Sequence, residues 1–185
     1  MALFGDGLER AVQRSFTRPI PKSAGAQMRY LVRQLKGTRA AAELLGVSQR
    51  TVERYVKNQI RTPRPQLAAR LETEVRRRWQ PQVRARARQR AATTDGIVVD
   101  TLARIGYTAP IGTTDDARLR QLTVALPPQY AARLFDAQQQ GADERRLMEI
   151  TAEGLKEVYF QDAGRRAGSL EEVRFTDVEH VDFEL

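Results

Sequence analysis

Few residues of this 185-residue chain carry side chains that could perform chemistry on their own. The sequence has no cysteine, which excludes disulfides and thiolate metal sites, and its single histidine, His180, lies in an acidic tail. Neither a zinc site of histidine and cysteine nor a Ser-His-Asp triad can be assembled from such a composition. We therefore expect His180 to be a solvated surface residue.

Hydroxyl and carboxylate groups come together in the segment 106–116, GYTAPIGTTDD, whose glycines, proline and threonines predict a loop. Asp115 and Asp116 directly follow Thr113 and Thr114, so the two aspartates either help to bind a metal ion or belong to a solvated turn. A threonine hydroxyl is a poor nucleophile without a base or a metal ion, and the sequence places no base beside this pair. We expect no catalytic site and no metal site of the chain's own.

Tyr107, Tyr130 and Tyr159 are alternative nucleophiles, of the kind that a DNA-breaking nuclease or recombinase would use. Such an enzyme needs arginines and a general acid gathered around the tyrosine, and the sequence offers no such cluster. Tyr130 and Tyr159 fall at helical positions where packing is the more common role. The sequence therefore favours a protein that is not an enzyme.

The charge of the chain is divided unequally between its halves. Residues 1–92 contain 21 Lys and Arg against 6 Asp and Glu, a net charge of +15, whereas residues 93–185 contain 10 against 17, a net charge of −7. A strongly basic half predicts binding to a polyanion, and an acidic half is expected to contact protein. We predict a basic DNA-binding domain, 1–92, and an acidic protein-contact domain, 93–185.

The stretch from Thr38 to Lys57, TRAAAELLGVSQRTVERYVK, fits a helix-turn-helix. Gly46 supplies the left-handed residue of the turn, and Ser48 supplies the N-cap of the second helix. Ala42 is the small residue expected where the two helices touch. The apolar residues expected to fill the space between the helices are Ala41, Leu45, Val47, Val52 and Tyr55.

The second helix of this motif leaves a polar face turned outward. Its side chains are of the types that contact base edges and phosphates in DNA. A helical hairpin in another all-α domain has the same apolar pattern, but the basic surroundings favour DNA. The residues that we expect to bind DNA are Gln49, Arg50, Glu53, Arg54 and Lys57.

Further helices are expected on either side of the motif. Apolar stripes predict three helices: one over 6–17, one that begins after an N-cap at Ser23, and one over 65–79. Together these helices would form the scaffold of the motif. Thr38 is expected to cap the first helix of the motif. The segment 84–90 carries an arginine at every second position, a spacing that circles a helix, so we interpret it as a basic arm or linker.

The C-terminal half has the pattern of a mixed domain. Strands are expected over 97–99 and 121–126, helices after Pro127-Pro128 and after an N-cap at Asp143, and an alternating acidic tail from Val173. The order strand-helix-helix occurs in ribbon-helix-helix units, which dimerise by pairing their strands, and in ordinary α+β domains. We predict an α+β fold, an all-α half followed by a mixed α/β half through which the chain forms a homodimer.

Longer strings of the sequence resemble one family. LFGDGLERAV, RPIPKSAGAQMRYLV, LLGVSQRTVERYV, GYTAPIGTTDD and LTVALPPQYAARLFDAQ are similar to segments of the telomere-protecting terminal proteins of linear Streptomyces chromosomes and plasmids. The resemblance covers essentially all 185 residues. It implies a protein that sits covalently on 5′ DNA ends and acts as a primer for end replication.

The resemblance also implies a nucleotide-acceptor residue. In the family a threonine of the GYTAPIGTTDD segment accepts the first deoxynucleotide, expected to be dCMP, and by position that residue is Thr114. This makes 93–185 a priming domain as well. The activating Mg²⁺ ions are expected from the partner polymerase, so the chain has no cofactor of its own.

Partners and location follow from the same resemblance. They are telomeric DNA, a telomere-associated protein that recruits the terminal protein, and a DNA polymerase. The sequence has no apolar run of about 18 residues and no secretory signal, so we expect a cytoplasmic protein, associated with the nucleoid at replicon ends and not with a membrane. The alternative function is a plain helix-turn-helix transcription regulator.

Overall fold

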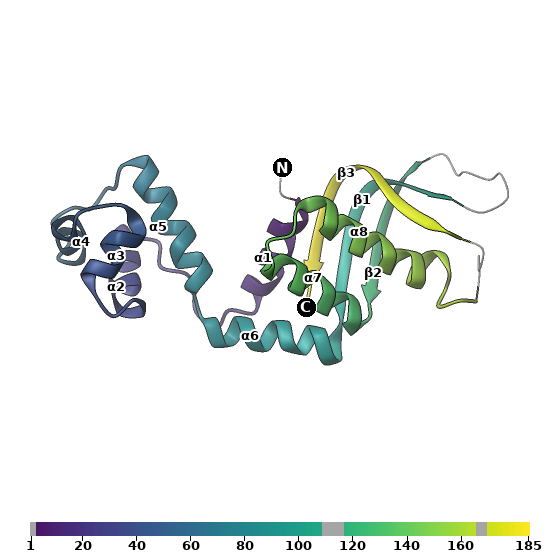
Figure 1. Cartoon of the computed structure of the whole chain (residues 1–185), viewed down its shortest axis with the longest axis horizontal. Helices are drawn as coiled ribbons and strands as arrows, with labels where there is room; N and C mark the ends of the chain where they lie inside the picture. Colours follow the sequence, from purple (N-terminus) through teal and green to yellow (C-terminus); the bar gives the residue numbers. More distant parts are fainter. Residues whose placement is uncertain (1–2, 109–116, 166–169) are drawn as a thin grey trace. The chain divides into compact units, whose positions relative to one another are not determined.

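The computed structural model describes residues 3–108, 117–165 and 170–185, and the chain divides into two compact units (Figure 1). The insert unit is Thr17–Pro81, and the sheet unit combines Met1–Phe16 with Gln82–Leu185. The division differs from the boundary expected at residue 92, because the first helix and the chain from residue 82 pack with the C-terminal sheet. The fold is α+β with helices at the N-terminus, as the sequence predicts.

Four helices form the insert unit: α2 (Ala24–Gln34), α3 (Thr38–Leu45), α4 (Gln49–Val56) and α5 (Pro65–Arg78). Ser23 is the N-cap of α2, as expected, and its hydroxyl accepts from the backbone N–H of Ala26 at 3.3 Å. The prediction that Thr38 caps α3 was wrong, because Gly37 holds the cap position and Thr38 is the first helical residue. The apolar stripes meet in one core, which buries Met28, Leu31, Leu45, Val52, Leu71 and Val75.

The two ends of the insert unit are tied to each other. The backbone N–H of Thr17 donates to Oε1 of Gln80 at 3.0 Å, and Nε1 of Trp79 donates to the carbonyl oxygen of Arg18 at 3.1 Å. The Trp79 ring also packs on Tyr30, with 4.7 Å between the ring centroids. An insertion whose ends meet in this way has the anatomy of a domain that folds by itself.

The sheet unit is built on three antiparallel strands in the order β2-β1-β3, with bounds β1 (Ile97–Thr108), β2 (Arg118–Leu126) and β3 (Glu172–Glu184). The central strand β1 is much longer than the predicted strand 97–99, and it includes residues 106–108 of the predicted loop. Val99 pairs with Val124 of β2 and with Phe183 of β3. Because β2 pairs with β1 of the same chain, the arrangement is that of an ordinary α+β sheet and not of a ribbon-helix-helix unit. Homodimer formation stays a prediction.

Helices α1 (Leu3–Arg14), α7 (Pro128–Gln139) and α8 (Glu144–Leu155) lie beside the sheet (Figure 1), and their buried side chains complete the hydrophobic core of the sheet unit. Burial alternates along β1, so Ile97, Val99, Thr101, Ala103 and Ile105 are fully buried while the residues between them are not. Asp143 caps α8, as expected. Short π-helical turns, η1 (Ala91–Asp95) and η2 (Lys156–Phe160), follow α6 (Pro81–Arg90) and α8.

The prediction that α1 supports the helix-turn-helix was wrong. Its apolar face, with Phe4, Leu8 and Val12, belongs to the core of the sheet unit. Glu144, on α8, accepts hydrogen bonds from the backbone N–H groups of Phe4 and Gly5 at 2.7 and 2.9 Å. A carboxylate at this position satisfies N–H groups that have no partner within the helix, so α8 fixes the start of α1.

The predicted basic arm is the helix α6 (Pro81–Arg90). Spacing by two distributes its arginines around the helix, and three of them contact residues outside α6 in the same unit. Arg84 is buried against Glu9 of α1, Arg88 donates to Oε1 of Gln138 at 3.3 Å, and Arg90 forms an ion pair of 2.9 Å with Asp95. These arginines therefore position elements of the fold.

Candidate DNA interface

The turn between α3 and α4 has the geometry that the sequence predicts. Gly46 adopts φ +65° and ψ +38°, a left-handed conformation that a residue with a Cβ adopts only with strain. Ser48 caps α4 and accepts from the backbone N–H of Thr51 at 3.2 Å. The apolar side chains predicted between the helices are buried, or half-buried in the case of Val47. The helix-turn-helix geometry is therefore confirmed, and DNA contact stays a prediction.

The outward face of α4 carries the side chains that the sequence singles out. Gln49, Arg50 and Arg54 are exposed, as is Lys57 at the C-terminal cap, and Glu53 is half-buried between them. Within the described residues, neither Arg50, Arg54 nor Lys57 forms an ion pair. Three cations on one exposed face, with no carboxylate partner in the part of the chain that the structure describes, are suited to bind phosphates and the acceptor groups of bases.

The insert unit as a whole is strongly basic, which adds to the attraction between α4 and phosphates. Residues 17–81 contain 15 Lys and Arg against 4 Asp and Glu, a net charge of +11, which leaves −3 for the sheet unit. The contrast between the units is therefore smaller than the +15 and −7 of the two halves, because α1 and α6 bring six arginines to the sheet unit. The net charge is still positive for the insert unit and negative for the sheet unit.

Gln49 links the two helices of the motif at their N-termini. Its amide Nε2 donates to Oγ1 of Thr38, the first residue of α3, at 3.1 Å, and to Oε1 of Glu53, one turn further along α4, at 3.0 Å. The sequence places Gln49 and Glu53 on one face but gives no sign of this chain of hydrogen bonds, because Thr38 lies 11 residues away and joins it only through the turn.

The C-terminal end of α4 is held by α2. Arg29 donates from Nη1 to the carbonyl oxygen of Val56 at 3.1 Å and to Oδ1 of Asn58 at 3.0 Å. A Cβ at Gly25 would lie 2.4 Å from Oδ1 of Asn58 and 3.2 Å from the carbonyl oxygen of Tyr55, so the helices approach more closely than a side chain allows. Sequence reasoning missed Gly25 and Arg29 as residues that position α4, since neither belongs to the motif.

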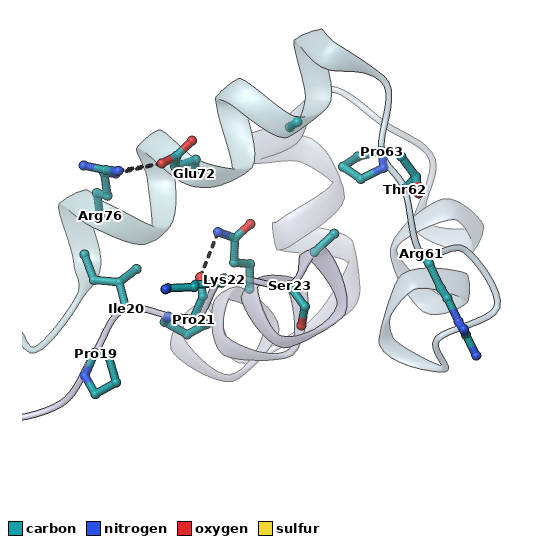
Figure 2. A pocket seen from close by; sticks show the side chains of 13 residues that line it. Pro19, Ile20, Pro21, Lys22, Ser23, Arg61, Thr62, Pro63, Glu72 and Arg76 are labelled. Atoms are coloured by element: carbon teal, nitrogen blue, oxygen red, sulfur yellow. Dashed lines mark hydrogen bonds and ion pairs between the residues drawn. The ribbon is translucent and has the colours of Figure 1, made fainter.

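Two open clefts flank these helices. One, of about 570 Å³, lies between the start of α2 and α5 and is lined by Pro19, Pro21 and Pro63 together with Lys22 and Arg61 (Figure 2). Its carboxylate, Glu72, is paired with Arg76 on α5 (Figure 2). The other, of about 590 Å³, lies beside the turn, and its lining includes Gly46, Ser48, Thr51, Arg64 and Arg70. Both clefts are rimmed by cations of the insert unit.

The predicted nucleotide acceptor, Thr114, follows β1 and precedes β2 in the sequence. Thr113, Thr114, Asp115 and Asp116 lie outside the described residues, in the stretch that follows β1 and precedes β2 along the chain. Among the described residues, no group of three or more His, Asp or Glu side chains could hold a metal ion.

The alternative tyrosine nucleophiles occupy different environments. Tyr130 is buried, and its hydroxyl donates to Glu157. Burial, and to a smaller extent this hydrogen bond to a carboxylate, raises the pKa of Tyr130 to about 12. The raised pKa opposes formation of a phenolate. The Tyr107 ring packs 6.0 Å from that of Phe160, and Tyr159 is exposed. His180 is exposed on β3, as expected.

No helix in the described part of the chain is long and apolar enough to cross a membrane. Comparisons of the chain with protein-family models, with curated proteins and with solved structures find no match.

Proposed function

We propose that the protein binds duplex DNA through α4 and acts as the covalently attached primer and cap at the 5′ ends of a linear replicon. The observation that supports DNA binding most directly is the outward face of α4. Its cations, Arg50, Arg54 and Lys57, have no carboxylate partner among the described residues, and they belong to a unit of charge +11. A helix of this kind enters the major groove with its N-terminal residues against the base edges.

The priming step rests on the resemblance to telomere terminal proteins. The Thr114 hydroxyl attacks the α-phosphorus of dCTP, a phosphodiester forms to the threonine oxygen, pyrophosphate leaves, and the hydroxyl proton passes to solvent. The polymerase holds the two Mg²⁺ ions that activate the hydroxyl and stabilise the leaving group. Thr114 is therefore a substrate group of the polymerase, and the chain is not the enzyme of this reaction.

The two units divide these tasks. The insert unit holds the DNA end, and the sheet unit presents the stretch between β1 and β2 to the polymerase. The negative net charge of the sheet unit repels DNA phosphates, so its surface is available to protein partners, among them the telomere-associated protein. The protein then resides on the nucleoid, at replicon ends.

The experiment that tests this function separates a primer from a transcription regulator. The full chain is incubated with telomeric template, α-labelled dCTP, magnesium and a polymerase-competent extract, and is then boiled in detergent. A primer keeps the label on the protein band, whereas a regulator releases all DNA and carries no label. A gel shift with the telomeric duplex, carried out without dCTP, tests DNA binding separately from priming.

A further inference from the structure

Gln49 has no amide hydrogen left for DNA. A glutamine that reads adenine must donate an N–H to N7 while its carbonyl oxygen accepts from N6. Both hydrogens of the Gln49 amide are already donated, one to Thr38 at 3.1 Å and one to Glu53 at 3.0 Å. In this arrangement Gln49 holds its neighbour in place, and Glu53 becomes the group that faces the groove.

Glu53 is a carboxylate on a cationic surface, yet no arginine among the described residues pairs with it. Within the described residues its only side-chain partner is Gln49, although Arg50 and Arg54 lie on the same helix. Only one of its oxygens, Oε1, is used by that hydrogen bond. A carboxylate near DNA phosphates is repelled, so a held carboxylate with a free oxygen is suited to a contact in which a base donates a hydrogen bond.

The major groove offers that donor most cleanly at one base. Guanine presents the acceptors N7 and O6, and thymine presents O4, so both repel a carboxylate. Adenine presents the N6 amino group, but beside the acceptor N7. Cytosine presents the N4 amino group alone, and acidic side chains accept from it in protein–DNA complexes.

We infer that Glu53 specifies a cytosine in the bound duplex, and that Gln49 and Thr38 are positioning residues that hold the Glu53 carboxylate for this contact. The inference rests on the proposed DNA binding and deepens it, because it names a base pair of the target. Arg50 and Arg54 contact guanines or phosphates on either side.

The test is selection of bound duplexes from a library with a randomised core, using the full chain. Wild type should enrich a site with a cytosine at one fixed position, preferred by about fivefold or more over the other bases. Glu53→Ala should lose that preference alone and should bind non-specific duplex at least as tightly as wild type, because a negative charge is removed. Glu43→Ala, which removes the exposed, ion-paired carboxylate of α3, is the charge-matched control and should keep the preference.

Two further variants separate reading from folding and positioning. Glu53→Gln retains the size of the side chain and supplies an amide, so the preference at the same position should move from cytosine towards adenine. Thr38→Val should weaken the cytosine preference, whereas Thr38→Ser, which keeps the hydroxyl, should restore it.

An unchanged cytosine preference in both Glu53 variants overturns the inference while leaving DNA binding intact. So does a wild-type site without any cytosine position that responds to Glu53. Failure of the wild-type chain to bind any duplex instead overturns the proposed function.

Discussion

Arg84 on α6 and Glu9 on α1 form a two-pronged ion pair, in which Nη1 donates to Oε1 at 2.7 Å and Nη2 donates to Oε2 at 2.6 Å. Only 10% of the Arg84 side chain is exposed. The pair joins the two segments of the sheet unit that border the insert unit along the chain, and the Arg84 guanidinium also lies 5.9 Å from the centroid of the Phe16 ring. The ion pair therefore holds together, within the sheet unit, the two segments that precede and follow the insertion in the sequence.

Replacement of Glu9 by glutamine should destabilise the sheet unit. The substitution leaves a buried guanidinium without its counter-charge, which costs about 1–3 kcal/mol of unfolding free energy. Glu149→Gln, at an exposed carboxylate paired with Arg145, is the control and should change stability little. Chemical denaturation of the full chain measures both. Equal stability of Glu9→Gln and wild type would show that the pair contributes nothing.

The effect of Glu9→Gln should depend on pH. Burial raises the pKa of the Glu9 carboxyl, but hydrogen bonds from Arg84 and Gln13 outweigh burial, so the pKa in the folded state lies below the ordinary value of 4.5. A lowered folded-state pKa gives stability that is complete above the unfolded value and is lost as the pH falls through the folded value. The stability difference between wild type and Glu9→Gln should therefore be constant at neutral pH and shrink below about pH 4.5. A difference that grows on acidification would contradict this sign.

The units predict which fragments fold. Residues 17–81 contain the whole core of the insert unit and both of its tied ends, so this fragment should be helical, melt cooperatively and bind duplex DNA. Residues 93–185 lack α1, α6 and the first two residues of η1, and with them Phe4, Leu8, Val12 and Ala91 of the sheet-unit core. That fragment should be unfolded or aggregate. Circular dichroism and gel shifts decide, and a well-folded 93–185 would show that α1 is dispensable.

The sequence predicted the helix-turn-helix almost completely. Gly46, Ser48 and the apolar residues between the helices are local features, and their spacing within 20 residues leaves little freedom. The outward face of α4 followed from the same periodicity, because a helix that buries Val52 and Tyr55 must expose Arg50 and Arg54.

The domain boundary could not be predicted in the same way. Leu8 and Val12 form an apolar stripe that any core could receive, and its partner, β3, is some 170 residues further along the chain. Likewise, the arginines of α6 look like a solvated arm until their partners Glu9, Gln138 and Asp95 are in place. Pairing over such distances depends on tertiary packing, which periodicity does not encode.

Gly25→Ala should weaken DNA binding, although it replaces none of the residues that face the DNA. The added methyl group displaces Asn58 and presses on the backbone at Tyr55, which shifts the end of α4, at a cost of about 1–3 kcal/mol in stability. The double variant Gly25→Ala/Asn58→Gly removes the clashing side-chain atom at a residue whose φ is +56°, so it should recover part of the loss. Thermal melts and gel shifts of the single and double variants test the contact. If the double variant is no better than Gly25→Ala, the clash with Asn58 is not its cause.

Arg50→Ala and Arg54→Ala should each weaken binding to the specific duplex by about 1–3 kcal/mol where the arginine reads a base edge. Wild-type affinity should fall steeply with salt, because phosphate contacts dominate. Arg77→Ala, at an exposed arginine of α5 paired with Glu74, removes the same charge elsewhere in the insert unit. Fluorescence anisotropy over a salt series measures all three variants. Equal losses in all three would mean that net charge alone drives binding and that α4 has no special role.

The acceptor residue is the most direct test of the primer function. After the priming reaction the labelled protein is digested, and the nucleotidyl-peptide is sequenced by mass spectrometry. We expect dCMP on Thr114 and release of the label by alkali. Labelling should persist in Thr113→Ala and in Tyr107→Phe, Tyr130→Phe and Tyr159→Phe. Thr114→Ala should lose the label and still shift DNA in a gel. Labelling of Thr114→Ala at the wild-type level, or a nucleotide mapped to Thr113 or to a tyrosine, would contradict the assignment of Thr114 as the acceptor.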